Sequence, residues 1–323
     1  MKVGIVGAGI AGLACARALK AEGHAVTLFD KGKRPGGRLS TLVLDGGLSW
    51  DFGAQYLKAN DPAFAAQCAG WRRAGVLADW ERGPPGALVG VPSMARLVSA
   101  GCEGLEVCFG ALVQRLDRDG DHWFLAGPDL REGPFDAVAI AVPAEQAAPL
   151  IGLHDMMLAC EAAAVRSKPC WTAMVAFDRP VPALPDWLRD RGGIAWASRD
   201  NAKPGRPPQE CWVIQAGTEW STANLERAAD DVAADLLAML AAEAGGSLPE
   251  PTFLKAHRWR FALPFGRRGR HLWNESLRLG AAGDWCSGAC IEDAWLAGTG
   301  LARDLAAASA GHEPQRQRKA AQS

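Results

Sequence analysis

Three glycines near the start of the chain, Gly7, Gly9 and Gly12, constrain its fold more than any other feature. They lie between a short apolar run at residues 3–6, typical of a buried strand, and a helical pattern at residues 10–22. At this spacing the first glycine permits a tight turn, and the second lets phosphate groups approach the backbone. The third lets the helix pack closely on the strand. The sequence therefore predicts a strand–turn–helix unit with a phosphate site.

The helix that follows the glycines would present the N–H groups of Ile10 and Ala11, with a partial positive charge, to these phosphates. A second apolar strand at residues 25–29 ends at Asp30, which Lys31 follows. The Asp30 carboxylate is then placed to accept hydrogen bonds from a ribose diol. If the glycines served only helix packing, this acid would be unexplained. We predict a dinucleotide site, which this motif alone could offer to NAD or FAD.

The rest of the chain reads as one parallel sheet interrupted by antiparallel strands. We expect a hairpin around Asp119-Gly120 and a buried strand at 135–142. Tryptophan-bearing strands follow at 171–177, 194–198 and 211–217, and a helix at 222–244 covers them. A strand at 278–281 and a helix at 291–308 return to the first unit. This predicts an α/β fold: a Rossmann-like domain with an inserted antiparallel-sheet substrate domain.

The predicted division has three parts. Residues 1–57, 91–150 and 272–310 form the discontinuous cofactor domain, and residues 58–90 and 151–271 form the substrate domain. Residues 311–323 have few apolar side chains to bury and are predicted to be a disordered tail.

Composition excludes several classes of protein. The formal net charge of -1 provides no field that would attract nucleic acid or an anionic membrane. No run reaches the ~18 apolar residues of a membrane span. The nine cysteines form neither a Cys-x-x-Cys pair nor a Cys/His cluster, so we expect no metal site. Reduced thiols indicate a cytoplasmic protein, and we expect a monomer or weak dimer.

Three further segments bear on the choice of cofactor. The first runs from residue 33 to 41 and contains Gly36-Gly37-Arg38; the second is Asp51-Phe52-Gly53-Ala54-Gln55-Tyr56; the third ends in Gly283-Asp284-Trp285. Together they resemble the cofactor motifs of the flavin amine oxidase superfamily, and the resemblance spans both ends of the chain. What it implies is FAD, bound non-covalently, because the covalent-attachment motif of some amine oxidases is missing.

The resemblance also implies a role for each segment. Gly37 and Arg38 would contact the FAD pyrophosphate, the latter through a bidentate guanidinium. Ala54 and Gln55 would lie against the flavin ring, and Val113 would hold the adenine through its backbone. Gly283 and Asp284 would bind the ribityl chain or the pyrophosphate. The helix beginning near Ile291 would point its N-terminus at the N1–C2=O edge of the flavin, where negative charge collects on reduction.

Within the superfamily the chain is most similar to the renalase family, especially its compact bacterial forms. The likeness lies in Asp30-Lys31, Gly36-Gly37-Arg38, the segment at 51–56, the stretch at 283–286 and His257-Arg258-Trp259-Arg260. It implies oxidation of 2- or 6-dihydronicotinamide dinucleotides to NAD(P)+, with O2 reduced to hydrogen peroxide. Hydride transfer from a dihydropyridine needs no general base, which suits a chain without an evident nucleophile–base constellation.

Three other functions stay open. An amine oxidase acting on a small amine usually frames its flavin with two aromatic rings, commonly tyrosines, whereas Tyr56 is the single tyrosine of this chain. A carotenoid- or porphyrin-type desaturase would need a long apolar tunnel, and no extended apolar helix is visible. A non-enzymatic flavin-binding redox protein would use the same motifs.

Candidate substrate residues come from the tryptophan-bearing strands and an arginine-rich stretch. We assign to this group Tyr56, Trp171, His257, Arg258 and Trp259. The stretch at 257–271 also holds Arg260, Arg267, Arg268 and Arg270, which would either meet the phosphates of a dinucleotide substrate or form the solvated face of a hairpin. Tryptophans in a sheet are more often core residues than pocket walls.

Overall fold

The computed structural model describes residues 1–266 and 269–310. The predicted disordered tail at 311–323, and Arg267 and Arg268 of the arginine-rich stretch, lie outside the described residues.

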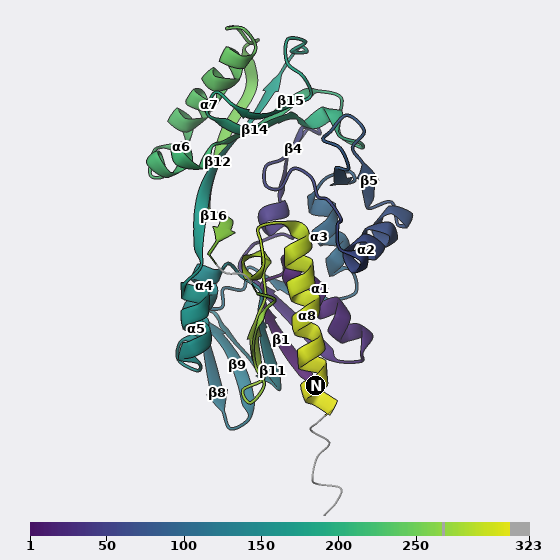
Figure 1. Ribbon diagram of the computed structural model, residues 1–323, viewed down its shortest axis with the longest axis vertical. Helices are drawn as coiled ribbons and strands as arrows, with labels where there is room; N and C mark the ends of the chain where they lie inside the picture. The colour runs from purple at the N-terminus through teal and green to yellow at the C-terminus, as the bar shows by residue number, and fades with distance from the viewer. Residues whose placement is uncertain (267–268, 311–323) are drawn as a thin grey trace, which may run out of the picture.

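A six-stranded sheet forms the centre of the lower half of the molecule in Figure 1. Its strands, in spatial order, are β17 (Leu272–Asn274), β18 (Leu279–Ala281), β11 (Ala137–Ile140), β1 (Lys2–Val6), β2 (Ala25–Asp30) and β7 (Glu106–Phe109). All neighbours are parallel except β17, which runs antiparallel to β18. The strands predicted at 3–6, 25–29 and 278–281 are confirmed. The strand predicted at 135–142 is shorter, because Phe135 ends the preceding strand.

Helices cover one face of this sheet and a small antiparallel sheet covers the other. Helices α1 (Ile10–Ala21) and α8 (Ile291–Ala310) pack against each other on the first face. The second face carries β8 (Arg115–Asp119), β9 (His122–Gly127) and β10 (Leu130–Phe135), which include the predicted hairpin. The contact is close: a Cβ added at Gly4 would lie 3.0 Å from Phe135 and 3.2 Å from Leu125.

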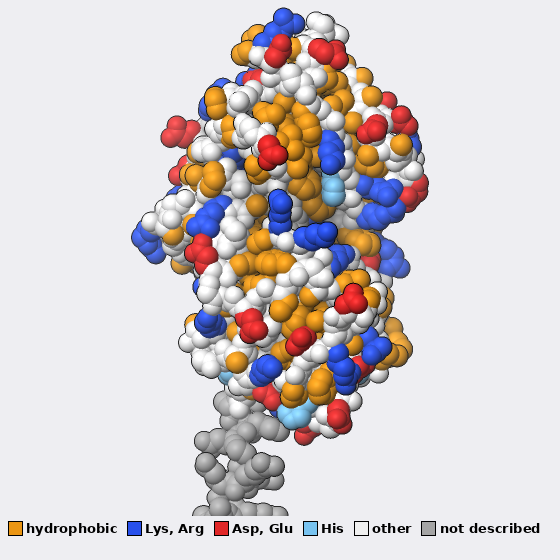
Figure 2. Space-filling model, turned by 180° about the vertical axis from the view of Figure 1, so that it is seen from behind, with side chains coloured by type: hydrophobic (Ala, Val, Ile, Leu, Met, Phe, Trp, Pro, Cys, Tyr) orange, Lys and Arg blue, Asp and Glu red, His pale blue; other side chains and the backbone are white. Residues whose placement is uncertain are grey.

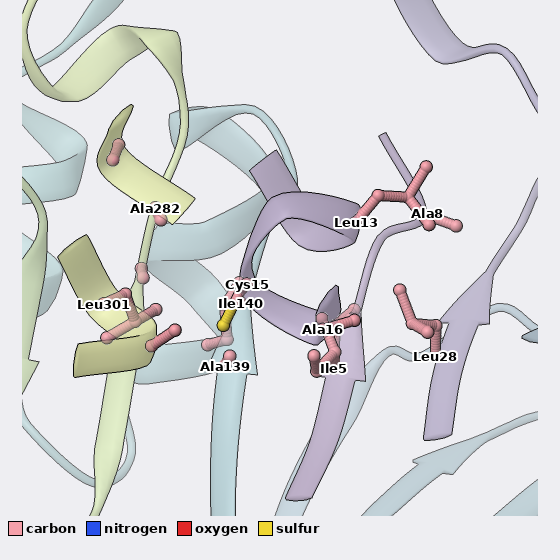
Figure 3. Packing of buried hydrophobic residues seen from close by; sticks show 14 of the residues in the cluster. Ile5, Ala8, Leu13, Cys15, Ala16, Leu28, Ala139, Ile140, Ala282 and Leu301 are labelled. Carbon is pink, nitrogen blue, oxygen red and sulfur yellow. The ribbon is translucent and has the colours of Figure 1, made fainter. Parts of the chain in front are cut away.

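The main apolar core fills the space between the parallel strands and these two helices. Ile5 of β1, Ile140 of β11 and Leu301 of α8 are each fully buried. Figure 3 shows them with Cys15 and Ala16 of α1 pointing toward the sheet, while Leu13 extends from the side of the helix toward Ala8. Burying such side chains contributes roughly 1.5–3 kcal/mol each, so this cluster fixes helix α1, whose first turn carries the glycine motif.

The upper half of the molecule is a five-stranded antiparallel sheet (Figure 1). Its order is β13 (Trp187–Arg191), β14 (Ile194–Arg199), β15 (Glu210–Ala216), β12 (Arg166–Phe177) and β16 (Pro251–Phe265). A separate apolar cluster lies between one face of this sheet and helix α7 (Ala229–Glu243). The opposite face is turned toward the parallel-sheet half.

The predicted helix at 222–244 is wrong in one respect: it is two helices, α6 (Thr218–Ala223) and α7. The break lies at residues 224–228. The indole N–H of Trp171 donates to the carbonyl of Asn224 at 3.0 Å, and Arg258 donates to the carbonyl of Leu225 at 2.6 Å. A continuous helix would bond these carbonyls to its own backbone. Partners from the neighbouring strands therefore favour the break.

The remaining elements connect and flank the two halves. They are β3 (Thr41–Val43), β4 (Ser49–Asp51), β5 (Leu77–Asp79), β6 (Leu88–Gly90), α2 (Pro62–Arg73), α3 (Ala95–Cys102), α4 (Ala144–Ile151), α5 (Met156–Ala163) and the 3-10 turns Gly37–Leu39, Asp200–Ala202 and Asp284–Cys286. Along the chain, strands of the parallel sheet come both before and after the antiparallel one. The predicted fold class is confirmed, while the exact domain boundaries stay a prediction. No helix in the described part of the chain is long and apolar enough to cross a membrane.

Glu292 ties the C-terminal helix to the loop that precedes α2. Its carboxylate accepts the backbone N–H groups of Asn60 at 2.7 Å and Asp61 at 2.6 Å and is only 9% exposed. We expect Glu292→Ala to lower the free energy of unfolding by about 1–3 kcal/mol, because two part-buried donors lose their charged acceptor. Glu103→Ala, at an exposed ion pair with Arg96, is the control and should cost less than about 1 kcal/mol. Equal losses in urea titrations would contradict this role.

Candidate cofactor and substrate cavity

The glycine motif forms the turn between β1 and α1, as predicted. Gly7 has φ = +102°, and a Cβ there would meet the carbonyl oxygen of Ala141 at 2.5 Å. A Cβ at Gly12 would lie 2.0 Å from the carbonyl oxygen of Gly7, so a larger residue would push the helix away from the strand. At Gly9 an added Cβ would meet no atom of the described residues within 4 Å, which leaves room beside the helix N-terminus.

Asp30 is fixed at the end of β2 by backbone donors. One carboxylate oxygen accepts from the N–H of Ala8 at 2.8 Å and the other from the N–H of Gly32 at 2.7 Å. Next to it, Lys31 reaches across to Gln146 at the start of α4, with 3.3 Å between Nζ and Oε1. The acid therefore lies beside the glycine turn, where the sequence predicts the ribose contact.

Arg38 and Asp284, from motifs at opposite ends of the chain, form a bidentate ion pair. The two Nη–Oδ distances are 2.7 and 2.6 Å, and Arg38 also donates to the carbonyl of Ala262 at 3.2 Å. The Asp284 side chain is 6% exposed and that of Arg38 is 34% exposed. A bidentate geometry of this kind holds the guanidinium in a fixed plane.

One cavity of about 1000 Å³ runs along these residues, at the upper end of the size of small-molecule sites. Most of the predicted cofactor residues line it: Gly7, Gly9, Ile10, Ala11, Asp30, Lys31, Gly37, Arg38, Ala54, Val113, Gly283, Asp284 and Ile291. Gly12 and Gln55 do not. Gly12 packs against the Gly7 carbonyl on the helix side of the turn, which agrees with its predicted role in close helix–strand packing.

The face of the antiparallel sheet toward this cavity is defined by strand register. Arg189, Trp196, Gln215, Thr172 and His257 are successive cross-strand partners from β13 to β16. Cross-strand partners share one face of a sheet, and Gln215 lines the cavity. The same face of β12 and β16 also presents Cys170 and Trp259 to the cavity.

This face is bonded directly to the segment at 51–55. The indole N–H of Trp259 donates to the carbonyl of Phe52 at 2.9 Å, and Gln215 donates to the carbonyl of Gly53 at 2.8 Å. The rings of Phe52 and Trp259 are stacked, with centroids 5.3 Å apart, and His257 packs edge-on to both. The antiparallel sheet thus fixes the segment that, by the family resemblance, is expected to lie against a flavin.

Four of the five candidate substrate residues lie away from the cavity wall. Trp171 is 2% exposed and faces α7, because neighbours along a strand point to opposite faces; its assignment as a pocket wall is therefore wrong. Arg258 also faces that side and pairs with Glu226 at 2.8 Å. The Tyr56 ring packs on Trp196 and its hydroxyl contacts Arg189. His257 packs edge-on against the Trp259 ring. Of the five, only Trp259 lines the cavity.

Several lining residues were missed by sequence reasoning. Those of α4 and its approach are Pro143, Glu145, Gln146, Pro149 and Leu150, and those of the antiparallel half are Cys170, Ala195, Gln215, Thr218 and Phe261. Nothing in the local sequence distinguishes them, since they reach the cavity through strand register and helix placement. One oxygen of Glu145, Oε2, is buried without a hydrogen-bond partner among the described residues.

Cys170 and His257, on the cavity-facing side of the antiparallel sheet, are neutral at pH 7. Burial raises the pKa of the Cys170 thiol to about 11. Burial, with a smaller contribution from Lys255, lowers the pKa of His257 below its usual value. Among the described residues no group of His, Cys, Asp or Glu is arranged to hold a metal ion.

Comparisons with known proteins agree on the family. Residues 5–69 match the NAD(P)-binding Rossmann-like domain, and residues 74–306, well over half of the chain, match the family described as flavin containing amine oxidoreductase. A 4,4'-diapophytoene desaturase of Staphylococcus haemolyticus is 43% identical over 61 residues, which is 19% of this chain and only 12% of that protein.

Two solved structures share the fold at low sequence identity. A putative protoporphyrinogen oxidase from Exiguobacterium sp. 255-15 has a TM-score of 0.77 and 13% identity, covering 95% of this chain and 98% of that one. Cyclohexylamine oxidase from Brevibacterium oxydans IH-35A has a TM-score of 0.71 and 12% identity, with the same coverage. This chain belongs to the flavin-containing amine oxidoreductase family and is an FAD-dependent oxidoreductase.

Proposed function

We propose that the cavity holds FAD along the cofactor motifs and that the enzyme oxidises a dihydronicotinamide dinucleotide, reduced at the 2- or 6-position, at its antiparallel-sheet end. The observation that carries this proposal is the charge of the side chains that line the cavity at its antiparallel-sheet end. The cavity residues there are neutral apart from Arg260, whose guanidinium is paired with Glu226 at 2.7 Å, and the described carboxylates of the wall, Asp30, Glu145 and Asp284, all belong to the other half. Without a carboxylate at that end a cationic amine would lose its water and gain no charged partner, which favours a neutral dihydropyridine ring.

The residues fit FAD in several respects. The open space beside Gly9 suits a pyrophosphate at the N-terminus of α1. Arg38 is held by Asp284 in a plane from which it would meet phosphate oxygens, and Asp30 would accept from the ribose. The N-terminus of α8 at Ile291, also in the wall, would stabilise negative charge at the flavin.

The proposed reaction needs little from the protein beyond position. When bound, FAD would supply a hydride acceptor at N5, so that the substrate would leave as NAD(P)+, and the two electrons would pass with two protons to O2 to give hydrogen peroxide. Cys170, Gln215 and Trp259 would orient the nicotinamide and exclude water, and none of them acts as a base. No disulfide joins the described cysteines, which supports the proposed cytoplasmic location.

A second candidate, oxidation of a small amine, has one observation in its favour. The unpartnered Oε2 of Glu145 lies in the cavity wall, where an ammonium group would satisfy it. Against this, Tyr56 does not line the cavity and Glu145 belongs to α4, beside Lys31 and the glycine turn rather than to the substrate sheet.

Non-covalent binding gives a simple expectation. The purified protein should be yellow, and heat denaturation should release all of its FAD into the supernatant, because no covalent-attachment motif is present. Absorbance of supernatant and pellet measures the split. Flavin that stays with the precipitated chain would contradict non-covalent binding.

Arg38 and Asp30 should each contribute to FAD affinity. We expect Asp30→Ala and Arg38→Ala to weaken binding by about 1–3 kcal/mol, the range for a lost charge-assisted hydrogen bond. The loss should be larger for Arg38, since its removal also leaves the buried Asp284 carboxylate beside the phosphates. Titration of apo-protein with FAD measures this, and Arg96→Ala, at an exposed ion pair, is the control. Unchanged affinity in both variants would remove these residues from the site.

The substrate is decided by anaerobic stopped-flow reduction. We expect rapid bleaching of the flavin by 2- or 6-dihydronicotinamide dinucleotides, slow bleaching by NADH and none by primary amines. Only an isomer whose hydridic carbon lies about 3–3.5 Å from N5 should react fast. Raising the salt concentration should weaken substrate binding if Arg260 meets a phosphate. Fast bleaching by benzylamine or a polyamine, with no response to the dihydronicotinamides, would establish the amine oxidase instead.

A further inference from the structure

Two carboxylates and two cations are buried together behind the segment at 51–55. Lys203 Nζ lies 2.5 Å from Asp200 and 3.4 Å from Asp51, and Arg206 lies 2.5 Å from the same oxygen of Asp51. All four side chains are at most 1% exposed. They come from the strand β4, the 3-10 turn at 200–202 and the loop after it. None of the four lines the cavity.

Both aspartates are bonded as carboxylates. Each oxygen of Asp51 accepts a hydrogen bond, from Thr41 and the N–H of Met94 on one side and from the two cations on the other. Asp200 accepts from Lys203 through one oxygen and from the N–H of Asp51 through the other. Burial raises the pKa of Asp200, while donors face both of its oxygens and Lys203 favours its ionised form. The cluster, which we call the buried quartet, then has two positive and two negative charges and no net charge.

The buried quartet is hydrogen-bonded to the segment at 51–55, part of which lines the cavity. Lys203 donates to the side-chain oxygen of Gln55 at 3.1 Å, and the Gln55 amide donates to the carbonyls of Asp51 and Gly53. The N–H of Ala54 donates to the carbonyl of Arg38 at 2.9 Å. Gly53 and Ala54 line the cavity, so the hydrogen bonds of the buried quartet reach, through Asp51 and Gln55, the backbone that forms the cavity wall.

Burying four charges is expensive, and ion pairs of this kind are often no more stabilising than apolar residues of the same size. Their position suggests a different use. We propose that the buried quartet tunes the reduction potential of the bound flavin, with Lys203 and Asp200 as positioning residues that balance its charge. The proposal rests on the proposed placement of the flavin against Gly53 and Ala54.

The sign of the effect follows from electrostatics. A reduced flavin gains negative charge, so a net negative charge behind Gly53 disfavours reduction and a net positive charge favours it. Lys203→Met leaves the quartet with one extra negative charge, and Asp200→Asn leaves it with one extra positive charge. The double variant Asp200→Asn/Lys203→Met is again neutral. A general disturbance of the fold would not produce opposite signs that cancel.

The test equilibrates each FAD-loaded variant with a redox dye of known potential and measures the ratio of reduced to oxidised flavin. We expect Lys203→Met to lower this ratio roughly tenfold and Asp200→Asn to raise it roughly tenfold, the size for one charge about 10 Å away at an effective dielectric constant of about 20. The double variant should lie within about twofold of the wild type. Asp235→Asn, at the exposed Arg227–Asp235 ion pair on α7, is the control and should change nothing.

Shifts of the same sign in both single variants, or no shift in either, would overturn the proposal. A single shift that persists unchanged in the double variant would do the same. If Lys203→Met does not fold, Asp200→Asn and the neutral double variant still decide the question. A wild-type protein that binds no FAD would instead contradict the proposed cofactor site, and absorbance at loading detects that outcome separately.

Discussion

The backbone at 51–55 is the part of the molecule on which the cavity depends, because both halves bond to it. From the antiparallel sheet, Trp259 and Gln215 donate to the carbonyls of Phe52 and Gly53. From the parallel-sheet half, the carbonyl of Arg38 accepts the N–H of Ala54, and the Arg38 side chain is itself held by Asp284. Hydrogen bonds to buried backbone groups are costly to lose, so this segment sets the distance between the cofactor motifs and the substrate-facing sheet.

The cofactor end of the cavity could be predicted because its parts are local or follow from topology. The turn with Gly7 and Gly12 is a matter of neighbouring residues and of sterics at two positions. The meeting of Arg38 with Asp284 follows from parallel strands, whose carboxyl ends lie at one edge of a sheet. Motifs at opposite ends of the chain were assigned to one site through their resemblance to the flavin amine oxidase superfamily, and the strand order explains why they meet.

The substrate end could not be predicted in the same way, because it depends on which face each strand presents. Trp171 and Trp259 both stand in strands with similar composition, yet one packs on α7 and the other lines the cavity. Lys203 and Arg206 belong to a loop rich in proline and glycine, a composition typical of solvated turns, and are nonetheless buried. The break between α6 and α7 depends on donors from distant strands.

The difference between the cofactor end and the substrate end of the cavity also explains why family membership leaves the substrate open. Structures at 12–13% identity keep this fold across nearly the whole chain, so the fold is retained where most of the sequence differs. What can vary is the row of side chains on the inner face of the antiparallel sheet, where a change of one residue alters charge or shape without altering register. In this chain that row and its neighbours offer Gln215, Cys170, Trp259 and, at the edge, Arg260. These walls carry no carboxylate, so under the proposed function they would position a substrate rather than exchange protons with it.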